Sequence, residues 1–388
     1  MAALWVAAII FVSGCSHHMA QPVGLSAGSI EIPSGSVMIV IDDPRSERRR
    51  LGAGSPAYNA PFSYARNPAL HRATARIAAR HELQVITHWP LQNLRVHCIV
   101  IDAPDPQTLL ALEADPEIRW VQSFNEFQTQ SAVAPKITAG FSRILRDLPG
   151  AAEGVTIAVV DTSIDSEHPA LDGSAIVQRN FAGSAGHFNA EPHGTAVVGL
   201  LSAQPKPSSR VAGLAHAAQV RVLRACWQTS AAATGMCNTL TLALALDAAI
   251  DLSPEVLNLS LTGGPDPVLD ALLEKLLARG TIVIAAFDEA RPVDARFPLP
   301  HAGVVYAYGG ADAPSTLNDR QQASFVMPAP RHALSLAPMA GYDLVSGHSI
   351  AAPHVSAMAA RIIAARPRAD RDAVLRELRQ RLACEQCD

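Results

Sequence analysis

The sequence lacks an excess of positive charge, which limits the partners that the protein can bind. Its 31 Lys and Arg residues are outnumbered by 35 Asp and Glu, and the formal net charge is -4. Nucleic-acid binding needs a clustered basic surface. The one basic run, at 45–50, is balanced by Asp42, Asp43 and Glu47. We therefore expect no nucleic-acid partner and interpret this run as a solvated loop rather than a processing site.

The sequence also lacks the motifs of metal and nucleotide sites. No spacing of Cys and His is typical of zinc, and no glycine-rich loop is placed to bind phosphate. We therefore expect no cofactor and no catalytic metal, while a structural calcium ion leaves no readable pattern. The second half of the chain contains no internal repeat and no low-complexity tract.

Cysteine is scarce, with six residues in the chain. Cys226 and Cys237 bracket a polar stretch and are spaced to close a loop. Cys384 and Cys387 form a Cys-x-x-Cys near the C-terminus, which suits a structural bridge better than a redox or metal site because no second pair and no βαβ context accompany it. This usage favours an oxidising compartment.

The first residues form an apolar stretch that is short for a membrane-spanning helix and ends in small residues before Cys15. The segment Val12-Ser13-Gly14-Cys15 resembles the bacterial lipobox, in which the signal is cut before the cysteine and the cysteine is acylated. The alternative is an ordinary signal peptide or a buried helix with an incidental cysteine. The resemblance implies membrane attachment through a lipid on Cys15, in a bacterial cell envelope, or secretion.

Length and composition favour two folded units in 388 residues, because single cores usually stop growing at about 250 to 300 residues. We expect a signal peptide at 1–14, a Gly, Ser and Pro-rich tether at 15–35, an α+β unit at 36–127, a linker with an N-terminal helix at 128–153, and a large domain at 154–388. In the small unit, hydrophobic patterning predicts alternating strands and helices. These elements are expected at 37–41, 70–81, 94–101, 106–114 and 118–124.

The large domain shows nearly continuous apolar strands alternating with helices, which indicates an α/β fold with a mostly parallel, buried central sheet between helical layers. Strands are expected at 156–161, 219–225, 255–261, 281–286 and 303–308. Helices are expected at 193–202, 239–251, 267–279, 349–365 and 370–381.

Three segments of this domain each place a reactive polar residue beside tightly packing neighbours. Asp161 ends a buried strand, at the sheet edge where ligands bind in open α/β folds. His193 begins a helix rich in small residues. Ser349 lies at a helix N-terminus, with Pro353 expected in the first turn. Singly, these residues are more simply a turn cap, a structural histidine and a helix cap.

Together, the three segments occur in the chain order Asp, His, Ser that is associated with subtilisin. They resemble the Asp-Thr-Gly, His-Gly-Thr and Gly-Thr-Ser-Met-Ala-x-Pro motifs of the subtilisin-like serine peptidases, over about 154–381. The resemblance implies the three-layer subtilisin fold, and the segments at 98–104 and 109–121 resemble the family's inhibitory, ferredoxin-like prodomain. It also implies a polypeptide substrate, with the prodomain as an intramolecular inhibitor or chaperone.

The chemistry of a serine endopeptidase requires these residue types. A serine hydroxyl is a weak nucleophile, so His193 would accept the proton of Ser349 and pass it to the leaving amine, while Asp161 orients the imidazole. The tetrahedral intermediate needs N–H donors, and the backbone of Ser349 offers one. By resemblance, Ser260, Leu261, Thr262 and Gly263 line the substrate cleft and pair with an extended peptide.

The expected second oxyanion donor departs from the family pattern. The family's Ala-Ala-Gly-Asn motif reads Ala285-Ala286-Phe287-Asp288, and an ionised Asp288 cannot donate a hydrogen bond. We expect activity to fall as Asp288 ionises, which either gives an acid-shifted profile or requires strong burial of the carboxyl. His348 replaces the usual Thr before the nucleophile and either supplies a donor or fills space. The alternatives are a weak or inactive peptide-binding lipoprotein, and an enzyme that turns over small esters.

Overall fold

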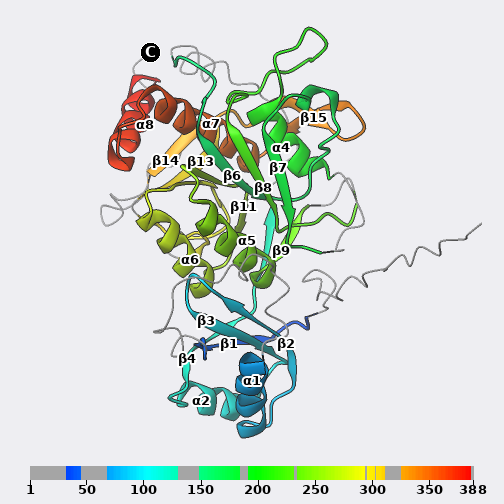
Figure 1. The fold of residues 1–388 in the computed structure, drawn as a ribbon, viewed down its shortest axis with the longest axis vertical. Coiled ribbons are helices and arrows are strands. Elements are labelled where there is room, and N and C mark those ends of the chain that lie inside the picture. The colour runs from blue at the N-terminus through cyan, green and yellow to red at the C-terminus, as the bar shows by residue number, and fades with distance from the viewer. Residues whose placement is uncertain are drawn as a thin grey trace, which may run out of the picture.

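The structure, a computed structural model, describes residues 32–44, 68–129, 148–183, 191–230, 234–292, 295–301, 303–310 and 325–385. The expected signal peptide, Cys15, and most of the tether and of the linker lie outside these residues, as does Cys387. Figure 1 shows a small unit, coloured blue to cyan, below a larger unit that contains the rest of the described chain.

The small unit is a four-stranded sheet with two helices, in the order β-α-β-β-α-β. All of its strand pairs are antiparallel, with the spatial order β2-β3-β1-β4. This is the arrangement of a ferredoxin-like unit. Its elements are β1 (Val37–Asp42), α1 (Pro68–Arg80), β2 (Val85–Leu91), β3 (Val96–Ile101), α2 (Pro106–Glu113) and β4 (Ile118–Ser123).

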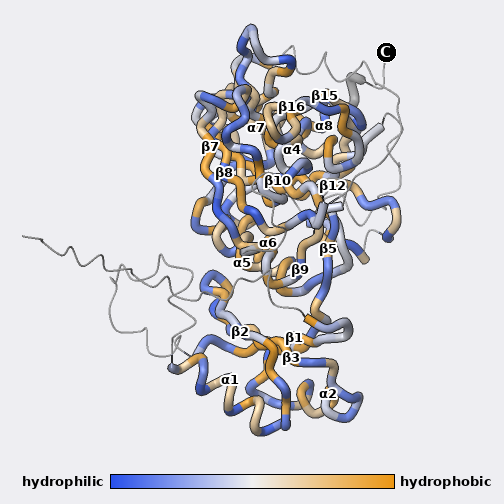
Figure 2. Tube along the Cα trace, turned by 90° about the vertical axis from the view of Figure 1, so that its right-hand side faces the viewer, coloured by the Kyte–Doolittle hydropathy of each residue, from blue (hydrophilic) through white to orange (hydrophobic). Residues whose placement is uncertain are grey.

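Both faces of the small sheet are buried, which explains why its central strands are apolar throughout. In β1, Ile39 and Ile41 face a core shared with α1 and α2, whereas Met38 and Val40 belong to the core that includes α5 and α6 of the large unit. Alternate side chains of a strand point to opposite faces. Figure 2 shows β1 and β3 as hydrophobic segments at the centre of the small unit. The continuous apolar pattern of these strands therefore indicates a sheet that is covered on both faces.

The large unit is built on a seven-stranded sheet of order β14-β13-β12-β10-β6-β8-β7, and every pairing in it is parallel. This confirms the predicted α/β class with a parallel central sheet. The strands are β6 (Thr156–Asp161), β7 (Ile176–Asn180), β8 (Gln219–Arg224), β10 (Val256–Leu259), β12 (Ile282–Ala286), β13 (Val304–Gly309) and β14 (Phe325–Ala329).

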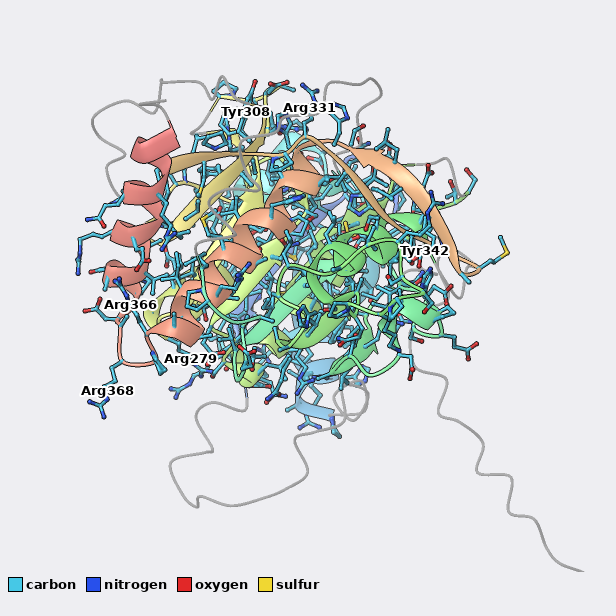
Figure 3. The ribbon with its side chains drawn as sticks, turned by 90° about the horizontal axis from the view of Figure 1, so that it is seen from above. Arg279, Tyr308, Arg331, Tyr342, Arg366 and Arg368 are labelled. Atoms are coloured by element: carbon cyan, nitrogen blue, oxygen red, sulfur yellow. A yellow bond between two sulfur atoms is a disulfide. The ribbon has the colours of Figure 1, made fainter. Side chains whose placement is uncertain are left out.

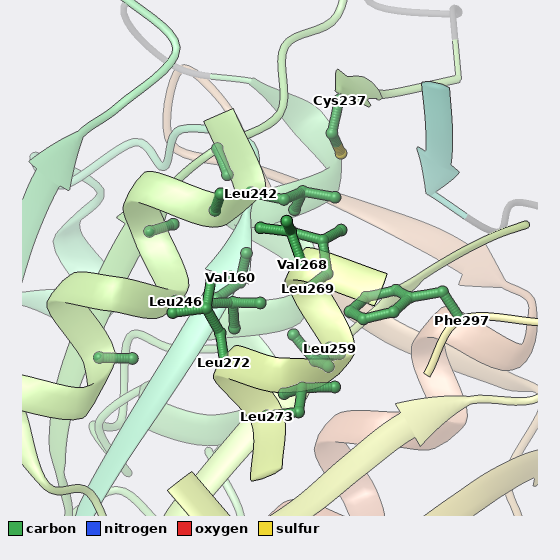
Figure 4. Close-up of a cluster of buried hydrophobic side chains, with 14 of the residues drawn as sticks. Val160, Cys237, Leu242, Leu246, Leu259, Val268, Leu269, Leu272, Leu273 and Phe297 are labelled. Atoms are coloured by element: carbon green, nitrogen blue, oxygen red, sulfur yellow. The ribbon is translucent and has the colours of Figure 1, made fainter. Parts of the chain in front are cut away.

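Helices cover both faces of this sheet. On one side, α5 (Thr239–Leu252) and α6 (Pro267–Ala278) form a leucine-rich layer, part of which is drawn in Figure 4. On the other side lie α4 (Pro192–Ser202), α7 (His348–Ala365) and α8 (Arg371–Glu385). A hairpin of β15 (His332–Ala337) and β16 (Gly341–Ser346) precedes α7, and a 3-10 helix, η4 (Pro169–Leu171), follows β6. The carboxyl ends of the parallel strands therefore lie at one edge, where the candidate site forms.

Short strands that the hydrophobic pattern did not predict form a second, three-stranded sheet of order β11-β5-β9. The strand expected at 255–261 breaks at Ser260 into β10 and β11 (Leu261–Gly263). Two strands that are distant in the chain, β5 (Glu126–Thr129) and β9 (Met236–Asn238), complete the sheet. Since β5 runs from 126 to 129, it crosses the boundary expected at 127 and pairs with strands of the large unit.

Candidate active site

The first two site residues meet at the carboxyl edge of the sheet. Asp161 ends β6 and is fully buried, and its Oδ1 lies 2.7 Å from Nδ1 of His193 in the first turn of α4. The same oxygen accepts a hydrogen bond from the backbone N–H of Thr162 at 2.7 Å. Because a carboxylate only accepts, Nδ1 carries the proton and Nε2 is the basic nitrogen. Among the described residues, His193 Nε2 is buried without a hydrogen-bond partner.

The glycine after His193 is required by close packing. A Cβ at Gly194 would lie 2.6 Å from the backbone oxygens of both Thr162 and Ser163, closer than real Cβ contacts. The N–H of Gly194 donates to Thr162 Oγ1 at 2.9 Å. The start of α4 can therefore lie directly against the turn that follows Asp161 only because residue 194 has no side chain.

Ser349 lies in the first turn of α7 and is fully buried. The helix begins at His348 with Gly347 as its N-cap, at φ 132°, so Ser349 is not the cap itself. Helix α7 packs on β10, β12 and β13 and against α4. Its N-terminus lies at the carboxyl edge of the sheet, where the Ser349 carbonyl accepts the hydroxyl of Ser260 and His348 Nδ1 accepts the N–H of Gly309. The N–H of Ser349 belongs to the first turn, where no carbonyl of the same helix can accept it. The structure thus gathers all three predicted residues at one edge.

Pro353 does not lie in the first turn, contrary to the sequence prediction. It lies inside α7, as the sixth residue of the helix. A proline there removes the N–H that would bond the carbonyl four residues earlier, which is the carbonyl of Ser349. That oxygen instead accepts the hydroxyl of Ser260 at 2.9 Å. The helix tolerates the proline because a neighbouring strand supplies the missing donor.

The predicted cleft residues lie beside this serine. Ser260, Leu261 and Thr262 are buried, and β11 pairs in antiparallel register with β5. Leu261 lies opposite Thr129, and Gly263 lies opposite Phe127. Since β11 leads away from Ser349, the antiparallel β5 runs toward it.

The ring of Phe127 fills the space that a side chain at residue 263 would need. A Cβ at Gly263 would meet the Phe127 ring at 1.9 Å. On its other side the ring makes an edge contact with Phe297, with centroids 5.4 Å apart. An extended segment of the same chain therefore pairs with β11, the strand that the resemblance assigned to substrate binding.

Asp288 follows β12 and is buried, and both oxygens of its carboxylate accept hydrogen bonds from the chain. Its Oδ1 accepts the N–H of Ala290 at 2.9 Å, and its Oδ2 accepts Arg291 Nη1 at 2.7 Å. In this arrangement the side chain of Asp288 accepts hydrogen bonds and does not donate one.

His348 is held by its own contacts. Its Nδ1 accepts the N–H of Gly309 at 2.8 Å, and its Nε2 lies 3.5 Å from Glu289 Oε2. The ring packs on Tyr308, with centroids 4.9 Å apart, and burial lowers its pKa, so the imidazole is neutral near pH 7. In Figure 3, Tyr308 lies beside Arg331 at the rim of the large unit. With Nδ1 accepting, the neutral ring carries its proton on Nε2, which lies beside Glu289.

A buried network of an ion pair and hydrogen bonds, which was not predicted from the sequence, lies beside His193. Glu191 and Arg224 form an ion pair, and the backbone N–H of His193 donates to the side chain of Gln228 at 3.1 Å. The signal available in the sequence was a glutamate two residues before the histidine and an arginine at the end of an otherwise apolar strand. Charged residues are rarely buried unless paired.

The predicted loop closure by cysteines is confirmed, with a disulfide between Cys226 and Cys237. It joins the turn after β8, where Cys226 N–H donates to the Asp161 carbonyl at 3.1 Å, to the cleft strand β9. Within the described ranges, Cys98 is a buried free thiol. Burial raises its pKa, so we expect it to be inert. Over the same ranges the structure has no cluster of three or more metal-ligating side chains and no helix long and apolar enough to span a membrane.

The subtilase family (Peptidase_S8) model matches residues 152–383, and the chain belongs to this family. The matched residues include all seven strands of the parallel sheet and helices α4 to α7.

Individual relatives and structures support the assignment. The chain is 30% identical over 273 residues to the M-protease of Shouchella clausii (strain KSM-K16), which covers 66% of both chains. It is 28% identical over 216 residues to thermitase of Thermoactinomyces vulgaris, 53% of this chain and 74% of that protein. Fervidolysin from Fervidobacterium pennivorans, a keratinolytic enzyme related to subtilisin, has a similar fold, with a TM-score of 0.59 at 17% identity over 88% of this chain and 56% of its own. The subtilisin-like fold is confirmed.

Proposed function

We propose that this chain is a serine endopeptidase that cleaves extended polypeptides through an acyl-enzyme intermediate. The observation that carries the proposal is the 2.7 Å contact between His193 Nδ1 and Asp161 Oδ1, beside the first turn of the helix that bears Ser349. In this mechanism His193 takes the proton of Ser349 during attack and returns it to the leaving amine, while Asp161 stabilises the imidazolium. The N–H of Ser349 donates to the oxyanion.

Covalent labelling tests this proposal directly. A fluorophosphonate probe should label the wild-type protein and should fail to label Ser349→Ala. The conservative Ser356→Ala, which removes a buried hydroxyl in the same helix bonded to Asn258 at 2.8 Å, should still be labelled. Equal labelling of wild type and Ser349→Ala would reject the assignment. A panel of peptides and small esters then separates an endopeptidase from an esterase.

We also propose that the small unit is a prodomain that inhibits the large unit. Strand β5, which leaves this unit, lies between β11 and β9 in the cleft, as an extended substrate would. Gln122 Nε2 bonds the buried Asp266 at 2.8 Å, and the N–H of Asn93 bonds Asp247 at 3.0 Å, so the unit is docked on α5 and α6. The small unit is accordingly joined to the large unit at two places. Its strand β5 pairs with β11 and β9, and its side chains and backbone bond to α5 and to the N-cap of α6.

Processing of the exported protein tests the prodomain proposal. We expect cleavage within the region 128–139, which joins the two units and mostly lies outside the described residues. Wild type should separate into two fragments whereas Ser349→Ala should remain one chain, and N-terminal sequencing should locate the cut. We also propose that the exported chain, before this cut, begins at an acylated Cys15 that attaches it to the cell envelope. The variant Cys15→Ala tests this attachment.

A second candidate function follows from Asp288. The ion pair with Arg291 leaves a negative charge where the family carries an oxyanion donor, and this favours a catalytically weak, peptide-binding protein. If the protein is instead an active peptidase, the same charge shifts the pH profile of its activity toward acidic pH. Probe labelling measured across pH separates the two, because a binding protein is not labelled at any pH.

A further inference from the structure

Glu191, two residues before His193, is a fully buried carboxylate with no part in the proposed reaction. It is the N-cap residue of α4, but its side chain does not cap that helix. It instead forms a two-pronged ion pair with Arg224, at 3.0 Å from Nε to Oε2 and 3.1 Å from Nη2 to Oε1. The side chain of Arg224 is only 5% exposed. An ion pair is thus enclosed at the start of the helix that carries His193.

The same carboxylate binds two backbone segments. Its Oε2 accepts the N–H of Ser163 at 2.6 Å, and its Oε1 accepts the N–H of Gln228 at 2.8 Å. Ser163 belongs to the turn after Asp161, and Gln228 belongs to the turn after β8. Four N–H donors on two oxygens satisfy an ionised carboxylate, which explains how it is retained in the interior. One side chain therefore ties together the turns that flank Asp161.

These turns in turn hold the first residues of α4. The side chain of Gln228 accepts the N–H of His193 at 3.1 Å, and Thr162 Oγ1 accepts the N–H of Gly194 at 2.9 Å. Helix N-termini carry N–H groups that need acceptors from elsewhere. Here the acceptors come from loops whose positions Glu191 fixes. The ion pair of Glu191 and Arg224 completes this hydrogen-bonded network. The network consequently sets the position of the imidazole relative to Asp161.

We propose that Glu191 and Arg224 are positioning residues for His193, acting through Ser163 and Gln228 to hold the imidazole against Asp161. This inference rests on the proposed function of Ser349. Proton transfer from hydroxyl to imidazole is sensitive to displacements of about 1 Å, which cost about 10²-fold in rate. We expect the pair to control the turnover rate more than substrate binding, which we assign to β11.

The test is Glu191→Gln in the full-length protein, with Gln228→Met as a second variant that removes only the acceptor for the His193 N–H. The expected result for Glu191→Gln is a fall of about 10²-fold in kcat and in the rate of fluorophosphonate labelling, with KM unchanged. The low-field proton resonance of His193 Nδ1–H should shift or broaden. Gln228→Met should act in the same direction and less strongly.

A matched control is available in α8. Glu377 is a buried carboxylate paired with Arg381 at 2.8 Å and Arg366 at 2.7 Å, in the helix that follows α7. Glu377→Gln should lower the melting temperature and leave kcat and the His193 resonance unchanged. A purely stabilising role for Glu191 would give the same pattern as this control.

Two outcomes would overturn the inference. One is a folded Glu191→Gln with wild-type kcat and an unshifted resonance. The other, which applies where Glu191→Gln does not fold, is a folded Gln228→Met with both properties unchanged. Failure of the wild-type protein to label would instead remove the proposed function, and the resonance would then still report whether Glu191 positions the imidazole.

Discussion

The hydroxyl of Ser260 donates to the carbonyl oxygen of Ser349 at 2.9 Å and so replaces the helical hydrogen bond that Pro353 removes. Asn258 Nδ2 donates to the same hydroxyl at 2.9 Å, which orients it. A buried carbonyl without a donor costs free energy comparable to a lost hydrogen bond. Ser260, between β10 and β11, therefore holds the backbone at Ser349 directly.

Ser260→Ala should lower the free energy of unfolding by about 1–3 kcal/mol, because the carbonyl of Ser349 is left buried without a donor. It should also lower kcat. Pro353→Ala restores an N–H at the right place, so the double variant should lose less than Ser260→Ala alone. Thr281→Val, which removes a buried hydroxyl bonded to the Pro254 carbonyl at 2.8 Å, is the control and should leave kcat unchanged. Denaturant unfolding and probe labelling give the two readouts.

Asp288→Asn should raise the labelling rate at neutral pH by about 10²- to 10³-fold, since an amide can donate to the oxyanion and a carboxylate cannot. It should also remove any acid shift of the profile. The control is Asp172→Asn, which breaks an exposed pair with Lys206 at 2.8 Å and should change neither property. A variant with the wild-type rate and profile would show that Asp288 does not face the oxyanion.

The stability of the large unit should fall as pH rises from about 4 to about 7. Burial raises the pKa of Asp270 from 3.8 to about 7, and the nearby carboxylates Asp266 and Glu274 add to this, although the N–H of Leu299 opposes it. The folded state thus holds a proton that the unfolded chain has released, so stability is greatest below that window and declines through it. Thermal unfolding of Asp270→Asn across pH should show a flatter profile than wild type. An equally steep profile would assign the dependence to another group.

Phe127→Ala should release β5 from the cleft, because it removes the ring that packs on Gly263 and Phe297. Truncating a buried Phe typically costs about 3–5 kcal/mol. Hydrogen exchange at Thr129, whose N–H bonds the Gly235 carbonyl at 2.8 Å, should become faster. Gln128→Ala, at an exposed position of the same strand, should leave the exchange rate unchanged. Unaltered exchange in Phe127→Ala would mean that backbone pairing alone holds the strand.

Local patterns were enough to predict the framework of the large unit. Strand β6 was predicted with its observed bounds, because a short, continuous apolar run that ends in a carboxylate is typical of a buried strand. The helices that begin near Thr239 and Pro267 were predicted to within a few residues, since Asn238 and Asp266 cap them through their side chains. The strand β11 lies where the resemblance placed a cleft-lining strand, whereas the short strands β5 and β9 were not separable from loops, because their pairing depends on partners more than 20 residues away.

What the sequence determined by itself was the set of reactive residues, Asp161, His193 and Ser349, and the class of fold that presents them, because residue type, spacing and hydrophobic period are local properties. What only the tertiary structure decided was how these residues are held. Glu191, Arg224 and Ser260 stabilise the site through contacts with segments from about 30 to about 90 residues distant. Such contacts form only when the sheet brings the carboxyl ends of β6, β8 and β10 together, and no local pattern encodes that meeting.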